Sequence, residues 1–256
     1  MTAFLFLFGL VVGSFLNSVI YRLDTGESII KSRSHCPYCK KTLSWLELIP
    51  LMSFIFQRGK CRHCKKPISW QYPLVELATG ILFALYCWYF YPNILLSIFY
   101  FLISGFLIVI FVYDLKHYII PDQIIYPAII VAGIWYLVSG IFIRDTSYEI
   151  LDTFLSAILA SAFFLAIILI SRGKWMGIGD AKLAFLMGLI LGWPKILAAL
   201  FLAFLIGAAI SVILLALKKK TLKSEIPFGP FLSLATVIAI FWGDILINWY
   251  LGLFSL

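Results

Sequence analysis

Two aspartates stand at the edges of apolar stretches, and their type and position suggest acid–base chemistry. Asp180 closes the segment Gly177-Ile-Gly-Asp180 just before an apolar run, and Asp114 ends an earlier run that begins at Ser104. Ionisable groups at membrane depth are costly and usually functional. Two carboxylates that can meet are able to activate a water molecule held between them. The pair therefore predicts hydrolysis, and a peptide bond is the expected target.

Each aspartate also has a structural interpretation. Asp180 can cap the helix that follows, because an Asp side chain accepts hydrogen bonds from the free N–H groups of a first turn. Asp114 would face the negative end of its helix, which is unfavourable unless Lys116 or His117 pairs with it. The same helix ends predict that Asp180 starts ionised, as the base, and that Asp114 starts protonated, as the proton donor.

Five other residues are candidates for supporting roles. Gly177 and Gly179 let the backbone approach another segment closely or adopt φ > 0, and they would also suit close helix packing. Asp122 follows a proline at the start of an apolar run, so it is expected to be a helix-start acid. Asn17 and Glu76 lie near the inner ends of the first two runs. There they would line a polar pocket for substrate or cofactor, or form hydrogen bonds between helices.

Four cysteines form a C-x₂-C, 21-residue, C-x₂-C pattern, which predicts a structural Zn²⁺ site with four thiolate ligands at Cys36, Cys39, Cys61 and Cys64. Two disulfides are the rival interpretation, which a reducing cytosol disfavours. A four-thiolate iron site stays open, and His35 or His63 could replace one ligand. Four thiolates fill the tetrahedral coordination of the metal and leave no open position for catalysis. The metal is therefore expected to stabilise residues 24–73, a segment too small to build its own core.

The elements that must position these residues are apolar helices. Hydrophobic residues make up 63% of the 256-residue chain and the mean hydropathy is +1.03, which indicates an all-α polytopic membrane protein. About eight transmembrane helices are expected, with a small cytoplasmic zinc-binding segment between the first and second. The chain then divides into a first helix at 1–23, the zinc segment at 24–73 and a transmembrane core at 74–256. The apolar runs are 3–22, 74–92, 94–113, 122–143, 150–171, 181–192, 194–217 and 228–254.

The net charge of +8 indicates membrane orientation rather than nucleic-acid binding, because of where the charges lie. With the N-terminus outside, all of the 20 Lys and Arg residues except Arg144 and Lys195 fall in inner segments. This asymmetry predicts that both termini are outside and that the basic loops, including the zinc segment, are cytoplasmic. It also places Asp114 and Asp180 at the same inner depth. No charged residue precedes Arg22, so the first run is expected to be a retained helix rather than a signal peptide.

Several motifs resemble those of one enzyme family. Asp114-Leu-Lys-His-Tyr-Ile-Ile-Pro-Asp122 and Gly177-Ile-Gly-Asp180 look like the two signatures of the type IV prepilin peptidases, which belong to the GxGD class of intramembrane aspartyl proteases. The matching stretches run in family order, so the resemblance covers essentially the whole chain. The others are Gly13-Ser-Phe-Leu-Asn17 with Tyr21-Arg22-Leu23, the four-cysteine segment, and Tyr72-Pro-Leu-Val-Glu76.

The resemblance implies that Asp114 and Asp180 are catalytic and that the substrate is the short basic leader of a type IV prepilin or pseudopilin in the bacterial inner membrane. It also implies N-methylation of the new N-terminus with S-adenosylmethionine, although no glycine-rich nucleotide fingerprint is visible. Membrane lipid is an expected partner and nucleic acid is not. Two other classes stay open, a proton-coupled transporter and a zinc-stapled assembly scaffold. A transporter is expected to have acids distributed across the bilayer and two repeated halves, and the sequence shows neither feature.

Overall fold

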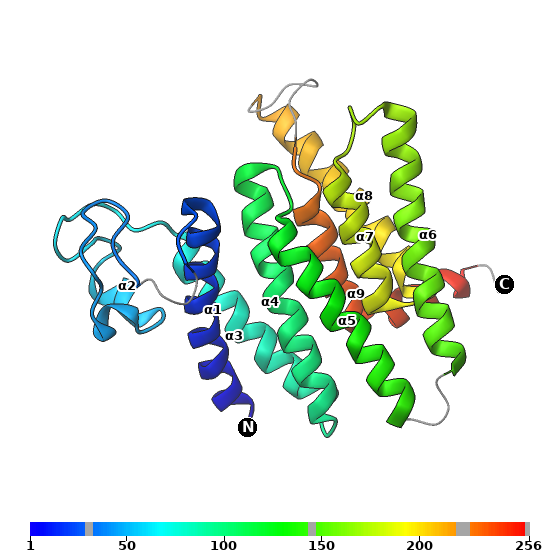
Figure 1. Cartoon of the computed structure of the whole chain (residues 1–256), viewed down its shortest axis with the longest axis horizontal. Helices are drawn as coiled ribbons and strands as arrows, with labels where there is room; N and C mark the ends of the chain where they lie inside the picture. Colours follow the sequence, from blue (N-terminus) through cyan, green and yellow to red (C-terminus); the bar gives the residue numbers. More distant parts are fainter. Residues whose placement is uncertain (29–32, 143–146, 219–225, 254–256) are drawn as a thin grey trace. The chain divides into compact units, whose positions relative to one another are not determined.

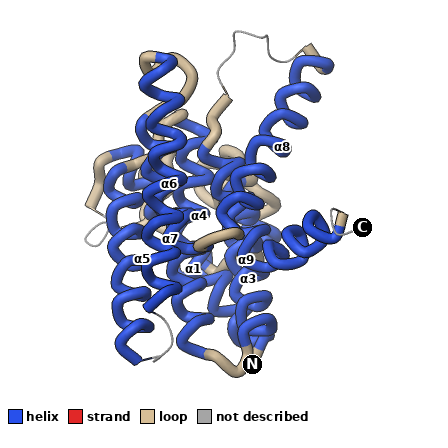
Figure 2. The backbone as a smooth tube through the Cα atoms, turned by 90° about the vertical axis from the view of Figure 1, so that its right-hand side faces the viewer, coloured by secondary structure: helices blue, strands red, loops and turns tan. Residues whose placement is uncertain are grey.

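In the computed structural model, the described residues are 1–28, 33–142, 147–218 and 226–253, and they form helices and loops with no strand (Figures 1 and 2). Two isolated β-bridges, at His35–Thr42 and Lys60–Pro67, lie in the four-cysteine segment. The helices are α1 (Thr2–Thr25), the 3₁₀ turn η1 (Trp45–Leu48), α2 (Met52–Phe56), α3 (Gln71–Phe90), α4 (Ile94–His117), α5 (Asp122–Phe142), α6 (Ser147–Ser171), α7 (Ile178–Leu191), α8 (Lys195–Ala216) and α9 (Gly229–Gly252).

The long helices confirm the expected all-α membrane architecture. Within the described residues, α1, α3, α4, α6, α8 and α9 are long and apolar enough to cross a membrane, which makes this a multi-pass membrane protein. The other two expected runs correspond to α5 and to the short helix α7. Prolines at 92, 121, 194 and 227 lie between long helices, as proline geometry predicts. Part of the charge argument falls on Lys31, Arg144, Lys219, Lys220 and Lys223, which lie outside the described residues.

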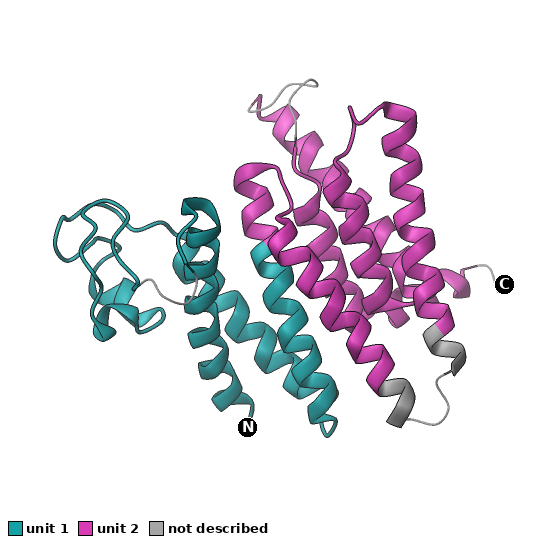
Figure 3. Cartoon of the chain, viewed as in Figure 1, with its two compact units in different colours: residues 1–109 teal, residues 110–256 magenta. Residues whose placement is uncertain are grey.

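The chain forms two compact units, residues 1–109 and 110–256 (Figure 3). In the first unit α1 packs against α3 with glycines at the contact. A Cβ on Gly13 would lie 2.6 Å from the Cα of Glu76, and one on Gly9 would lie 2.8 Å from the Cα of Gly80. Only residues without a side chain permit such a close approach of two helix backbones. The two helices therefore hold the ends of the segment between them in a fixed relation.

In the second unit α7 is the central helix, packed against α5, α6, α8 and α9. Its 14 residues are about 21 Å long at 1.5 Å per residue, less than the roughly 30 Å of a bilayer core. Nine of those residues, from Ala181 to Leu191, are buried. Gly188 lets α7 pack closely against α6, because a Cβ at this position would overlap the backbone of Ala157 in α6. Protein, rather than lipid, therefore surrounds the apolar surface of this short helix.

Candidate active site and metal centre

Asp114 lies in the last turn of α4 and is only 4% exposed. The first residue of α9, Gly229, lies against it: a Cβ there would be 2.5 Å from Oδ2 of Asp114. The backbone N–H of Gly229 interacts with the carboxylate. Oδ2 itself is buried and has no hydrogen-bond partner among the described residues. Such an orphaned buried oxygen is suited to hold a water molecule or a substrate group.

Asp180 is the third residue of α7. Its Oδ2 accepts a hydrogen bond from the backbone N–H of Gly177, at 3.2 Å, which satisfies one free donor at the helix start. Gly177 is the N-cap residue, in an extended conformation, and Asp180 lies three residues later, inside the first turn. Asp180 is therefore not the N-cap that the sequence suggested. Asp180 also lies close enough to Asp114 for their charges to repel each other.

Ile120 fills the space between the segments that carry the two acids. A Cβ on Gly179 would lie 3.0 Å from the Cβ of Ile120, and one on Gly229 would lie 3.2 Å from its Cδ1. The α4–α5 connection, the first turn of α7 and the first turn of α9 therefore converge around one apolar side chain. Gly179 serves close approach rather than positive φ, which is the first of the two roles expected for it.

Asp122 begins α5, as expected for a helix-start acid, and it forms an ion pair with Lys182 of α7 at 2.5 Å. The same ammonium group lies 4.8 Å from the centre of the Tyr126 ring. Lys182 is two residues beyond Asp180, and Asp122 is two residues beyond Ile120. This pair ties the start of α5 to the first turn of α7, so it fixes the segments that carry the two candidate acids.

Gly229 is the site residue that the sequence did not reveal, and it changes one expectation. We expected the end of α4 alone to favour a protonated Asp114. The first turn of α9 now supplies that carboxylate with a backbone N–H and the positive end of a helix. Each acid thus has one backbone N–H nearby, so helix ends no longer distinguish a base from a proton donor. The Gly229-Pro230 pair is a recognisable helix-start signal, but nothing in it points to Asp114.

The four cysteines of the two C-x₂-C pairs, here called knuckles, come together as a potential metal centre. Their sulfur atoms all lie within 4.8 Å of one another, and the Sγ atoms of Cys36 and Cys64 are 3.9 Å apart. Zinc–sulfur bonds of about 2.3 Å in a tetrahedron place neighbouring sulfurs about 3.8 Å apart, so the donor set fits Zn²⁺. None of the four is in a disulfide, and the histidines at 35 and 63 are not among these ligands.

The two knuckles have matching backbone geometry. The N–H of Lys40 donates to the carbonyl of Cys36 at 2.9 Å, and the N–H of Lys65 donates to that of Cys61 at 3.0 Å. Both lysines adopt the left-handed conformation, with φ of 58° and 60°. The turns are therefore tight even though neither position is the glycine that this conformation favours.

The electrostatics of the cluster are compatible with a bound cation. Backbone N–H groups of Cys64 and His63 lower the pKa of the Cys61 thiol to about 7, which favours the thiolate that binds metal. The N–H of Lys66 lowers the pKa of Cys64, but burial and the three neighbouring sulfurs outweigh it and raise that pKa to about 11. Four thiolates in contact are mutually repulsive, so a bound divalent ion is what would allow all of them to ionise.

Asn17 and Glu76 form hydrogen bonds that join elements of the first unit. Asn17 donates to the carbonyl of Tyr72 at 3.0 Å and accepts from the side chain of Gln71 at 3.2 Å. Oε2 of Glu76 accepts the backbone N–H of Leu51 at 2.8 Å. Because these polar atoms are engaged, the geometry favours the hydrogen-bonding interpretation of both residues over the pocket interpretation.

Comparison with known proteins covers nearly the whole chain. Residues 7–90 match the Bacterial Peptidase A24 N-terminal domain, and residues 101–212 match the Type IV leader peptidase family. The chain is 34% identical to a prepilin leader peptidase/N-methyltransferase of Bacillus subtilis, covering 98% of each chain. It is also 34% identical to one of Legionella pneumophila (96% of this chain, 93% of the other) and 32% identical to one of Aeromonas hydrophila (96% and 92%). No solved structure matches.

Proposed function

Because the chain belongs to the type IV leader peptidase family, we propose that it removes the leader from type IV pilin-like precursors and N-methylates the new N-terminus. The observation that carries the peptidase activity is the convergence of Asp114 and Asp180 at one end of the second unit. The names of the three relatives and the Type IV leader peptidase family model agree with this reaction. The convergence adds the residues that would perform it.

The proposed mechanism uses one water molecule and the two carboxyl groups. The ionised aspartate takes a proton from the water as its oxygen attacks the carbonyl carbon of the scissile bond. The protonated aspartate donates a hydrogen bond to the carbonyl oxygen. Collapse of the tetrahedral intermediate breaks the C–N bond, and the aspartate that took the proton from water gives it to the leaving amine. Two acids whose charges interact titrate as a pair, so the roles describe states of the pair rather than of one residue.

The proposed location is the bacterial inner membrane, with both termini outside and the zinc segment in the cytoplasm. The distribution of Lys and Arg supports it. Inner-face acids suit a precursor whose basic leader stays in the cytoplasm while its apolar segment enters the bilayer. The proposed domains are those expected from the sequence. They are the first transmembrane helix at 1–23, the zinc segment at 24–73, and the peptidase core at 74–256.

Zn²⁺ is proposed as the ion of the four-cysteine site, where it would hold the segment together. S-adenosylmethionine is the methyl donor that the relatives' names imply. The cavity beside η1 and α2 has four cationic residues and one acid on its lining, which does not suit a molecule that carries a sulfonium cation. We therefore assign no residues to the methyl donor and derive no step through it.

The test is incubation of the purified protein with a leader-bearing precursor and mass measurement of the product. Asp114→Asn and Asp180→Asn should each lower cleavage at least about 1,000-fold, the scale of a lost acid–base group. Asp244→Asn is a matched control, because this exposed acid pairs with Lys195 and lies in the last part of α9, away from the pair. Cleavage by both pair variants at the wild-type rate would leave a scaffold or a transporter as the better interpretation.

A further inference from the structure

The segment between α1 and α3 exposes a dense apolar surface around η1 and α2. The aromatic and aliphatic residues there are exposed by more than a third of their surface, and Phe56 is 77% exposed. Inside the segment, Phe54 packs against the Trp70 ring with centroids 5.0 Å apart. Phe54 thus contributes to the packing inside the segment, whereas the exposed residues remain on its surface. They are Trp45, Leu46, Leu48, Ile49, Met52, Ile55 and Phe56.

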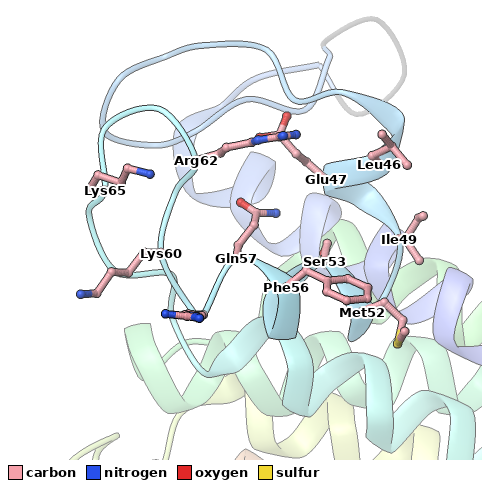
Figure 4. Close-up of a pocket in the computed structure, with 11 residues that line it drawn as sticks. Leu46, Glu47, Ile49, Met52, Ser53, Phe56, Gln57, Lys60, Arg62 and Lys65 are labelled. Atoms are coloured by element: carbon pink, nitrogen blue, oxygen red, sulfur yellow. The ribbon is translucent and has the colours of Figure 1, made fainter.

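A cavity of about 600 Å³ lies beside this surface and is apolar on one side and cationic on the other (Figure 4). Ile49, Met52 and Phe56 form much of the apolar side, while Lys60 and Lys65 lie across the cavity from them. Arg58 and Arg62 add two more cations to the lining, and Glu47 is its one acid. Arg62 extends toward Glu47 in the close-up, and the charges of these two residues attract each other.

The cations are held next to the apolar surface by a tight turn at the end of α2. The N–H of Arg58 donates to the carbonyl of Ile55, and the N–H of Gly59 donates to that of Phe54, both at 2.9 Å. Arg58 and Gly59 have φ of 51° and 66°, so the chain reverses within two residues. Positive charge and exposed apolar side chains are thus fixed side by side rather than separated by a flexible loop.

The segment cannot leave the membrane surface, because both of its ends continue into spanning helices, α1 and α3. One contact fixes the depth of the apolar surface. The N–H of Leu51, which lies between η1 and α2, donates to Glu76, the sixth residue of α3. Leu51 therefore lies level with the second turn of a membrane helix. At that depth, exposed apolar side chains meet the boundary between lipid headgroups and acyl chains.

From these observations we propose that the cavity and the η1–α2 surface bind an anionic phospholipid of the surrounding bilayer. The phosphate would lie among Arg58, Lys60 and Lys65, and the acyl chains would follow Met52 and Phe56. Depth and charge together favour a lipid over an acidic peptide, because the apolar side of the site opens where acyl chains are present. Basic residues gain affinity for anionic headgroups near a membrane surface. The inference does not depend on the peptidase activity.

The experiment uses the full chain with its metal, purified in detergent and titrated with phosphatidylglycerol or phosphatidylcholine during native mass spectrometry. Arg58→Gln with Lys60→Gln should weaken phosphatidylglycerol binding about 10-fold, equivalent to about 1.4 kcal/mol, and should leave phosphatidylcholine binding unchanged. Lys40→Gln with Lys66→Gln removes the same charge from the same segment without touching the cavity. A separate variant, Phe56→Ser, tests the apolar side, and metal content shows that each variant is folded.

The proposal predicts selective loss in the cavity variant and retention in the control variant. Equal phosphatidylglycerol binding by both double variants would overturn it, because the charge effect would then be non-specific. A cavity variant that keeps its lipid but binds an acidic prepilin peptide more weakly would also overturn it in favour of a peptide site. If the double variant loses its metal, Phe56→Ser decides alone: unchanged lipid binding by that variant refutes the site.

Discussion

The sharpest test of the site is Gly229→Ala, because the new methyl group points at Asp114. A Cβ at this position would lie 2.5 Å from Oδ2 of Asp114, 3.1 Å from its Cγ and 3.2 Å from Cδ1 of Ile120, whereas ordinary contact begins at 3.4 Å. Relief of the overlap requires the carboxylate or the start of α9 to move by about 1 Å. A displacement of about 1 Å can lower the rate of a positioned reaction about 100-fold.

The expected result is therefore a loss of about 100-fold in kcat with a much smaller effect on folding. Overpacking at a buried contact costs about 1–3 kcal/mol, so the helices should persist at room temperature. The assay is cleavage of a leader-bearing precursor at saturating concentration, with thermal unfolding followed by circular dichroism. Gly133→Ala is the control, because a Cβ on that α5 residue meets nothing within 4 Å. Wild-type kcat in Gly229→Ala would refute the placement of Asp114 against α9 as a catalytic requirement.

Three further predictions concern an ion pair beside the candidate acids, a contact of the four-cysteine segment, and the metal centre. Lys182→Gln removes the partner of Asp122 and should lower kcat by about 10-fold through misplacement of the first turn of α7, with little change in KM; an unaltered kcat would show that this ion pair does not position the site. Glu76→Ala leaves the Leu51 N–H without its acceptor and should destabilise that contact by about 1–3 kcal/mol. Amide exchange should therefore speed up in residues 45–60 but not in α9. An equal change in both regions would show that the hydrogen bond does not hold residues 45–60 in place. Removal of metal by a chelator should expose the thiols of the four cysteines and loosen residues 33–70 while the long helices stay folded; elemental analysis that finds no metal in freshly prepared protein contradicts the assignment.

The sequence alone was sufficient for the helices and for the four-cysteine cluster. Apolar runs of spanning length depend on composition within a single stretch, so their positions could be read without knowing any contact between stretches. The run expected at 194–217 and the helix Lys195–Ala216 differ by a residue at each end. The cysteine pattern is similarly local, because each C-x₂-C pair forms its own knuckle and the metal requirement joins the two. The prediction that both acids lie at one membrane depth used the charge asymmetry, which is summed over whole loops and likewise needs no contact between them.

What surrounds each acid was decided by tertiary packing. The approach of Gly229 to Asp114 joins residues 115 positions apart, and it removed the basis of an expectation that considered one helix end alone. Likewise, Glu76 could be assigned to a pocket from its depth, but its hydrogen bond to Leu51 depends on how the four-cysteine segment folds back onto α3. The physical reason is the same in both cases. A local pattern fixes which groups need partners, while the partner itself is chosen by which distant backbone can approach closely enough to supply one.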